Sequence, residues 1–238
     1  MIRLVWLFDV DGTLLRTFGS REAFRAATRL LTGEDDTLEG VSFAGRTDPL
    51  ILAEIMKRHG RTLTAADTER FWQVAREVMG RVLSEGKGLV LPGVQPLLEA
   101  IRQEPTWIPA LLTGNTAAMA RLKLEAFDLA DSFVFGAFGD EAPDREALAC
   151  RAVAEARSRW SVTPERCVVV GDTELDIACA RAAGAKVVAV TTGTRTRADL
   201  APLAPDLLLD DLSDPGPLLD WARALAADGE APAACRES

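Results

Sequence analysis

Short apolar segments that alternate with helical segments constrain the fold of this chain more than any other feature of its sequence. Residues 3–8 are apolar almost throughout, as in a strand that is buried on both faces of a sheet. From Trp107 onward, further short apolar runs alternate with stretches whose apolar residues recur at helical spacing. This pattern predicts an α/β fold built on a doubly wound parallel sheet.

The pattern also predicts where the later elements lie. Strands are expected at 107–112, 132–135, 167–170, 186–190 and 206–209, and helices at 116–127, 145–160, 175–183 and 217–225. Residues 20–84 contain no strand-like run and have apolar residues at helical spacing, which predicts a small all-helical insertion after the first strand. We therefore expect a core formed by residues 1–15 and 91–227, a helical insertion at 16–90, and a flexible tail at 228–238.

The charge balance limits the partners that such a chain can bind. The formal net charge of −9 argues against a nucleic-acid backbone and against an anionic membrane surface. A small anionic molecule is compatible with it, because a metal ion and one or two cationic side chains reverse the field locally. No segment approaches the ~18 apolar residues of a membrane span, and the apolar start is too short for a signal peptide, so we expect a cytoplasmic protein. Its single histidine argues against a zinc site or a Ser-His-Asp triad.

Two aspartates directly follow the first predicted strand, in the segment DVDGT at residues 9–13. Residues two apart in an extended chain point the same way, so Asp9 and Asp11 are expected to face one cavity. Carboxylates this close repel each other unless a cation lies between them or one is protonated. A metal ion and a phosphate meet this requirement: one carboxylate ligates magnesium and attacks phosphorus, and the other handles the proton of the leaving oxygen. Gly12 allows close backbone approach, and the amides around Thr13 can hold phosphate oxygens; the alternative is a solvated turn.

The segment DVDGT resembles the first motif of the haloacid dehalogenase superfamily, and later strand ends carry further matches. The predicted strand 107–112 runs into Thr113, Gly114 and Asn115, which resembles the second motif, an apolar strand that ends in Thr or Ser. A hydroxyl before a helix N-terminus suits a phosphate oxygen, so the resemblance implies phosphate binding by these three residues. Helix capping by Thr113 or Asn115 is the alternative.

The strand 167–170 is followed by the segment GDTELD, which resembles the fourth motif of the family in its GDxxxD form. The resemblance implies that Asp172 ligates magnesium directly. Asp176, one helical turn later, is expected to orient the site or to act on the metal through water. Few protein ligands suffice because magnesium keeps several waters in its octahedron. A capping carboxylate at a helix start is the alternative.

The third motif of the family is a lysine, or occasionally an arginine, on the helix before the fourth strand. Lys123 follows the second motif too soon for this role, and Lys186 comes after the fourth. Arg145 begins the appropriate helix, so we assign the role of neutralising Asp9 and the transferring phosphoryl group to it, in place of the commoner lysine. A solvated arginine in a first helical turn is the alternative.

The helical insertion lies between the first and second motifs, where it resembles the C1 cap of the family. Such a cap closes over the site, excludes water and contributes substrate contacts. The candidate contact is the loop at residues 45–48, in which Arg46 could meet a substrate anion, while Thr47 or Asp48 caps the next helix.

Together, the resemblance implies a Mg²⁺-dependent, phosphoglycolate-phosphatase-like hydrolase that acts on a small phosphorylated metabolite through an aspartyl-phosphate. Asp9 would attack phosphorus, Asp11 would act as acid and base, Thr113 and Arg145 would assist, and the metal would be held among Asp9, Asp11, Asp172 and Asp176. A dehalogenase is disfavoured because it needs no metal and usually lacks the second acid. A phosphoglucomutase-type phosphoryl transferase shares all the core motifs, and a non-catalytic phosphate-binding protein is a further alternative. The oligomeric state, monomer or homodimer, is left open.

Overall fold

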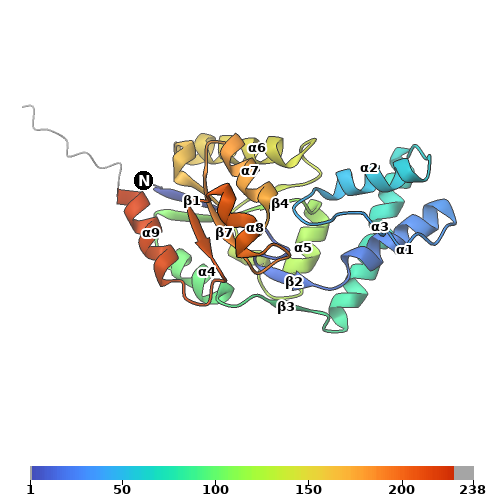
Figure 1. Cartoon of the computed structure of the whole chain (residues 1–238), viewed down its shortest axis with the longest axis horizontal. Coiled ribbons are helices and arrows are strands. Elements are labelled where there is room, and N and C mark those ends of the chain that lie inside the picture. Colours follow the sequence, from blue (N-terminus) through green and yellow to red (C-terminus); the bar gives the residue numbers. More distant parts are fainter. Residues whose placement is uncertain (1, 228–238) are drawn as a thin grey trace, which may run out of the picture.

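The computed structural model describes residues 2–227, and its central feature is a parallel sheet (Figure 1). The strand order of this sheet is β5-β4-β1-β6-β7-β8. These strands are β1 (Leu4–Phe8), β4 (Trp107–Thr113), β5 (Gly136–Phe138), β6 (Cys167–Gly171), β7 (Lys186–Val190) and β8 (Leu207–Leu209). Every pairing in this sheet is parallel. The predicted α/β class is confirmed, whereas the predicted tail at 228–238 lies outside the described residues.

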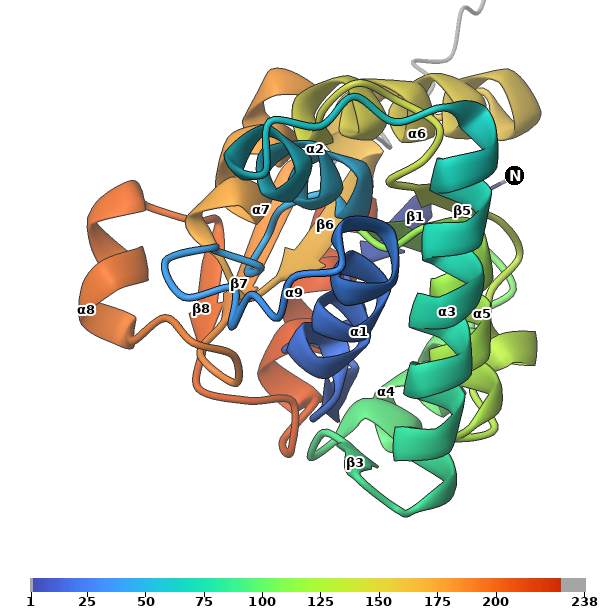
Figure 2. The same cartoon turned by 90° about the vertical axis from the view of Figure 1, so that its right-hand side faces the viewer.

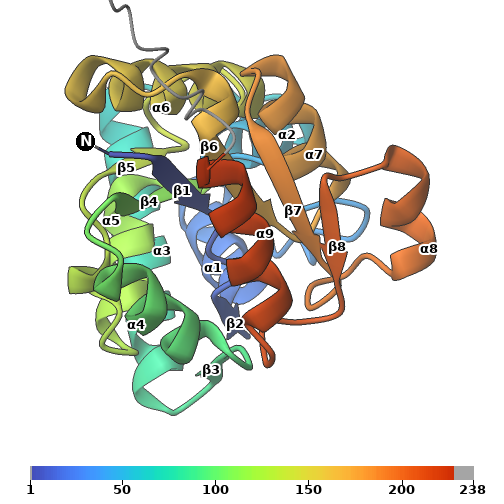
Figure 3. The same ribbon diagram turned by 90° about the vertical axis from the view of Figure 1, so that its left-hand side faces the viewer.

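Helices cover both faces of the sheet, which explains why its central strands are apolar on both sides (Figure 1). The helices of the core are α4 (Val94–Gln103), α5 (Ala117–Glu125), α6 (Arg145–Trp160), α7 (Glu174–Ala182), α8 (Arg197–Leu200) and α9 (Gly216–Ala227). Trp6 and Phe8 of β1 belong to an apolar cluster with α4 and α9, whereas Val5 and Leu7 belong to one with α6 and α7. Figure 3 views the molecule from the end opposite the insertion, where β1 begins and α9 crosses in front of the sheet.

The helical insertion predicted after the first strand is present and has a core of its own. Its helices are α1 (Ser20–Thr32), α2 (Asp48–Arg58) and α3 (Ala65–Ser84), and Figure 2 shows them in front of the carboxyl edge of the sheet. Phe24 makes edge-to-face contacts with Phe43, Phe71 and Trp72 at centroid distances of 5.2–5.7 Å. Met119 of α5 is part of the same apolar cluster, so the insertion packs on the core through this helix. We call α1–α3 and their connections the cap below.

A two-stranded antiparallel ribbon connects the cap to the core. The chain enters the cap through β2 (Leu15–Thr17) and returns through β3 (Gly88–Val90). The sequence analysis did not predict these strands. Each has only three residues, too few for an alternating pattern to be recognised.

The strand predicted at 132–135 is wrong. Residues Ala130–Ser132 form a 3₁₀ turn, and the edge strand β5 begins four residues later than predicted, at Gly136. The Leu111 amide of β4 donates to the Phe135 carbonyl, and Pro109 presents its nitrogen to the same side but has no hydrogen to donate. The Val134 amide donates to the Pro109 carbonyl, but Pro109 returns no hydrogen bond, so bonds in both directions begin only at the Leu111 amide. The side chains of Phe133 and Phe135 pack against the apolar clusters without a strand.

Among residues 2–227, no helix has the length and apolar character needed to cross a membrane. The expected cytoplasmic location stays a prediction.

The turn before α4 packs tightly against the segment at Leu212, and this contact can be tested. Gly93 has φ +78, and a Cβ there would overlap the Leu212 carbonyl, whereas Gly60 has φ +61 with open space around it. Positive φ alone costs a non-glycine residue roughly 1–2 kcal/mol. We expect Gly60→Ala to lower the unfolding free energy by about this amount, and Gly93→Ala to lower it clearly more. Urea unfolding of both variants measures this difference, and equal losses would contradict the predicted overlap.

Candidate active site

The chain bends sharply after β1 and turns two aspartates toward one cavity. The Asp9 amide donates to the Val170 carbonyl of β6 at 2.9 Å, so the backbone is still held in the sheet at this residue. Gly12 then takes φ +88, and its amide donates to the Leu15 carbonyl. A Cβ on Gly12 would lie 2.6 Å from Asp172 Oδ2, so both the turn and the close approach of Asp172 require glycine here.

A cavity of about 370 Å³ lies between this turn and the cap. It brings together most of the residues that the motifs predicted: Asp9, Asp11, Gly12, Arg46, Thr113, Gly114, Asn115, Arg145 and Asp172. Thr13 and Asp176 are buried behind its wall rather than lining it. Asp48, which belongs to the predicted contact loop 45–48, also lines the cavity, as do Lys123, Phe43 and Thr194, whose contributions the sequence analysis did not predict.

Asp9 is buried and lies against Arg145. The Arg145 Nη2 is 3.1 Å from Asp9 Oδ1, and the same nitrogen donates a hydrogen bond to Asp176. Burial is the main reason that the pKa of Asp9 rises to about 7, and it outweighs the opposing effect of Arg145. Arg145 begins α6, as the motif assignment required, and lies where it can neutralise charge on Asp9.

Asp172 and Asp176 differ in their surroundings, although both follow β6. Asp176 Oδ2 accepts hydrogen bonds from the Thr173 amide and hydroxyl, and Arg145 occupies Oδ1, so both of its oxygens are engaged. Asp172, 3% exposed, accepts within residues 2–227 only a long contact of 3.4 Å from Thr13. Burial first, and then Asp176 and Asp9, raise the pKa of Asp172 to about 8.

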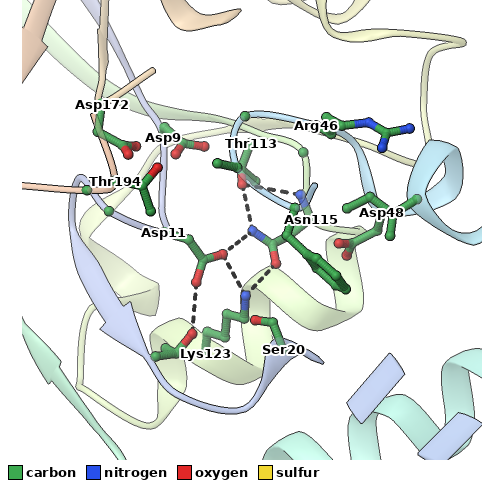
Figure 4. Close-up of a pocket in the computed structure, with 18 of the residues that line it drawn as sticks. Asp9, Asp11, Ser20, Arg46, Asp48, Thr113, Asn115, Lys123, Asp172 and Thr194 are labelled. Atoms are coloured by element: carbon green, nitrogen blue, oxygen red, sulfur yellow. Dashed lines mark hydrogen bonds and ion pairs between the residues drawn. The ribbon is translucent and has the colours of Figure 1, made fainter. Parts of the chain in front are cut away.

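These acids fit a divalent cation. Ligand oxygens of Asp9, Asp172 and Asp176 lie within 4.8 Å of one another, and Figure 4 shows the carboxylates of Asp9 and Asp172 side by side. A Cβ on Gly193 would overlap Asp172, so glycine at that position leaves room for this carboxylate. Buried acids with so few donors favour a bound cation, and Mg²⁺ prefers oxygen ligands. Because Asp176 is fully engaged, Asp9 and Asp172 are the better direct ligands.

Asp11 has three hydrogen-bond donors around its carboxylate. Thr17 donates to Oδ1 at 2.9 Å, and both Asn115 Nδ2 and Lys123 Nζ donate to Oδ2, at 2.8 and 2.6 Å (Figure 4). Burial alone would raise the pKa of Asp11, but Lys123 and these hydrogen bonds hold it below its ordinary value. The two aspartates after β1 therefore have opposite surroundings, which is typical of carboxylates with different tasks.

Lys123 is the residue that the sequence analysis dismissed. Its position on α5 gave a signal, because the buried stripe of this helix is Met119, Ala120, Lys123 and Leu124, so the lysine occupies an apolar position of the helical pattern. Lysine is almost never fully buried unless it is paired. A lysine on the apolar face of a helix that follows a motif is therefore a detectable sign of a buried partner.

Thr113 and Asn115 form a second wall of the site. Thr113 is fully buried, and its Oγ1 accepts hydrogen bonds from the Asn115 amide at 3.3 Å and from Asn115 Nδ2 at 2.9 Å. With its oxygen accepting two bonds, the hydroxyl keeps its proton available for an anionic oxygen. Gly114 between them has no space for a side chain, because a Cβ would overlap the Arg46 carbonyl of the cap loop, residues 45–48.

The cap loop docks on the core mainly through the backbone. The Asp48 amide donates to the Gly114 carbonyl at 2.7 Å, and Asp48 Oδ2 accepts from the Thr116 amide at 2.9 Å. Thr47 is the N-cap residue of α2, although its side chain makes no capping hydrogen bond. Arg46 lines the cavity, and its guanidinium is paired with Glu54 of α2.

Comparisons with known proteins agree with this geometry. A sequence profile described as haloacid dehalogenase-like hydrolase matches residues 5–184. A phosphoglycolate phosphatase of Cereibacter sphaeroides is 29% identical over 197 residues, which are 79% of this chain and 85% of that protein.

Two solved structures share the fold. One, of a predicted phosphoglycolate phosphatase from Haemophilus somnus, has a TM-score of 0.72 and 21% identity, and covers 92% of this chain and 98% of that one. The other, CbbY from Rhodobacter sphaeroides in complex with phosphate, has a TM-score of 0.69 and 22% identity, and covers 91% of this chain and 97% of that one.

The buried Asp48 carboxylate gives a pH-dependent prediction. Burial is the main cause that raises the pKa of Asp48 from 3.8 to about 7. An acid whose pKa is raised on folding destabilises the folded state increasingly as pH rises between these two values, and by a constant amount above the higher one. We expect Asp48→Asn to gain stability relative to the wild type as pH rises from about 4 to 7. Urea unfolding of both proteins across this range tests it, and a pH-independent difference would contradict the raised pKa.

Proposed function

The chain belongs to the haloacid dehalogenase-like hydrolases and is a phosphatase of that family, and we propose that it hydrolyses small phosphomonoesters with Mg²⁺ through a phosphoryl group carried by Asp9. The observation that carries the proposal is the pair of aspartates after β1, which line one cavity with opposite surroundings. Asp9 lies with Asp172 in a cluster short of positive charge, whereas Asp11 is held by three donors. The first arrangement suits a nucleophile beside a metal, and the second favours the ionised form of Asp11, which can accept a proton from water in the second step.

In the first step, an oxygen of Asp9 attacks phosphorus, and the bond between phosphorus and the leaving oxygen breaks. The electron pair goes to the leaving oxygen, which takes a proton from Asp11; because Asp11 is ionised in the free enzyme, it takes up this proton from solvent when the substrate binds. In the second step, water attacks the phosphorus of the aspartyl-phosphate, and Asp11 takes a proton from that water. The bond between phosphorus and Asp9 then breaks, which releases phosphate and restores both carboxyl groups.

The other residues support these steps in the proposal. Asp9 and Asp172 would hold Mg²⁺, which supplies positive charge against the phosphoryl oxygens when bound. Arg145 neutralises Asp9 from the opposite side, and Asp176 orients Arg145. The Thr113 hydroxyl and the amides from Gly12 to Thr13 and from Gly114 to Asn115 would receive phosphoryl oxygens.

The cavity volume and the cap loop favour a small substrate. About 370 Å³ lies at the small end of ordinary ligand pockets, roughly 300–1,000 Å³. Arg46 is the cation of the cap loop that lines the cavity, where it would meet an anionic leaving group. Phosphoglycolate, the substrate in the names of several relatives, fits both features and is our first candidate substrate.

A panel of small phosphomonoesters that includes phosphoglycolate tests the reaction. We expect phosphate release in the presence of Mg²⁺, loss of release with EDTA, and recovery when Mg²⁺ is added in excess. Asp9→Asn should lower kcat by at least about 10⁴-fold because it removes the nucleophile, while circular dichroism and the unfolding midpoint stay near those of the wild type. No release from any substrate, or release that survives Asp9→Asn, would overturn the proposal. Isomerised sugar phosphate without net phosphate release would instead favour the phosphoryl transferase.

Metal binding gives a test that does not depend on turnover. Isothermal titration of the wild type with Mg²⁺ should show one site per chain. Asp172→Asn is expected to weaken this binding by at least about tenfold, since removal of one of two anionic ligands costs more than about 1.4 kcal/mol. Asp210→Asn, which changes an exposed acid paired with Arg197 outside the cavity, is the control and should bind Mg²⁺ as the wild type does. Equal affinity in all three proteins would contradict the assigned ligands.

A further inference from the structure

Lys123 is a buried cation in the cavity to which the family motifs assign no role. It is 2% exposed, and it projects from the second turn of α5. Its Nζ lies 2.6 Å from Asp11 Oδ2 and 2.7 Å from Asn115 Oδ1. Withdrawing an ammonium group from water costs several kcal/mol, which only well-made contacts offset. The geometry of these contacts therefore indicates what the residue does.

Lys123 and Asn115 hold Asp11 as a closed triangle of hydrogen bonds. Asn115 accepts from Lys123 through Oδ1 and donates to Asp11 through Nδ2, and both groups converge on the same Asp11 oxygen (Figure 4). Thr17 holds the second oxygen of Asp11 from the other side. With both oxygens fixed, the Asp11 carboxylate cannot rotate without losing a hydrogen bond.

Lys123 also determines how Asn115 is oriented. Asn115 Nδ2 donates to Thr113 Oγ1 as well as to Asp11, so its amide must present oxygen to Lys123 and nitrogen to the other two. Without the ammonium group, the amide oxygen loses this donor, and rotation of the amide would withdraw the donor from Asp11. The loss of Lys123 would therefore release Asp11 by two routes.

We propose that Lys123 is a positioning residue for Asp11, which it fixes beside Asp9 in the direction needed for proton transfer. The inference rests on the proposed phosphatase reaction, since it concerns the proton of that reaction. Arg145 serves Asp9 and Asp176, whereas Lys123 serves Asp11, so the two aspartates after β1 each have their own buried cation.

The leaving group of the substrate distinguishes this role from a general structural one. A p-nitrophenolate leaving group departs with little help from an acid, whereas an alkyl alcohol needs the proton of Asp11 in the first step. The ratio kcat/KM reports only the steps up to release of the alcohol. Lys123→Met removes a cation that lowers the pKa of Asp11, so it should not deprive Asp11 of its proton. We nevertheless expect kcat/KM for an alkyl phosphate that the wild type accepts to fall by about 10²-fold or more, because Asp11 loses its fixed orientation. For p-nitrophenyl phosphate it should fall by less than about tenfold.

A burst measurement checks the second step in the same variant. Asp11 also accepts the proton of water when the aspartyl-phosphate is hydrolysed. Lys123→Met should therefore release about one equivalent of p-nitrophenol per enzyme rapidly and turn over slowly afterwards. The wild type should show a smaller burst or none under the same conditions.

Two further variants complete the design. Lys186→Met removes an exposed lysine that pairs with Asp206 at the start of β7, outside the cavity, and should leave both kcat/KM values unchanged. Lys123→Gln keeps a hydrogen-bond donor without the charge, so it should fold even if Lys123→Met does not. Its loss of kcat/KM for the alkyl phosphate should exceed its loss for p-nitrophenyl phosphate, by a smaller factor than in Lys123→Met.

Other kinetic outcomes would contradict the proposed role of Lys123. Equal losses for the two substrates would reduce Lys123 to a structural residue. A loss confined to the KM of anionic alkyl phosphates would make it a substrate contact instead, and unchanged kinetics would remove any role. If the wild type releases neither p-nitrophenol nor alcohol, the proposed function fails and this inference fails with it.

Discussion

Negative charge gathered at the carboxyl edge of the sheet is the constraint on which the rest of this structure depends. Asp9, Asp172 and Asp176 are all nearly excluded from water, and Asp11 lies beside them. Such a cluster is unfavourable without counter-charges, because each buried carboxylate loses its hydration. Arg145 and Lys123 supply two positive charges from within the chain, and a divalent cation would supply the other two.

The sheet explains why the two internal cations can act separately. Arg145 begins α6, which packs with the apolar cluster on one face, whereas α5 contributes Leu124 to the cluster on the other face. The turn at residues 9–13 lies between these helices at the edge of the sheet. Arg145 therefore contacts Asp9 from one side, and Lys123 contacts Asp11 from the other. The two carboxylates have different chemical environments although they are neighbours in the turn.

Much of the fold and of the site was predictable, because parallel strands and phosphate chemistry leave strong local patterns. The bounds of α6 and β7 agree with their predictions residue for residue, since capping and flanking turns define them. Asp9 was identified because a buried strand rarely ends in two acids, and Asp172 because the segment GDTELD resembles a motif of the family; both line the cavity. Their catalytic and metal-binding roles stay proposals, as does the contact between Arg46 and a substrate.

The errors have physical causes that a local pattern does not contain. The strand β5 was displaced because Pro109, on a different strand, cannot donate to it. Lys123 was dismissed for the third-motif role from its order along the chain, whereas its contact with Asp11 depends on the buried face of α5, which only the folded structure shows. Asp48 was interpreted as a helix cap, but it bonds to the backbone of a segment almost seventy residues away.

The docking of the cap loop on main-chain atoms has a consequence for how this enzyme can diversify. Asp48 bonds to the Gly114 carbonyl and the Thr116 amide, backbone groups that any residue other than proline at position 116 presents. The surface of the core that binds the cap loop therefore depends little on side-chain identity, provided that residues 114 and 139 stay glycine, because a Cβ at either position would overlap a backbone carbonyl. Caps with different inner surfaces could bind to this surface, so the substrate range can change while the residues that transfer the phosphoryl group stay the same.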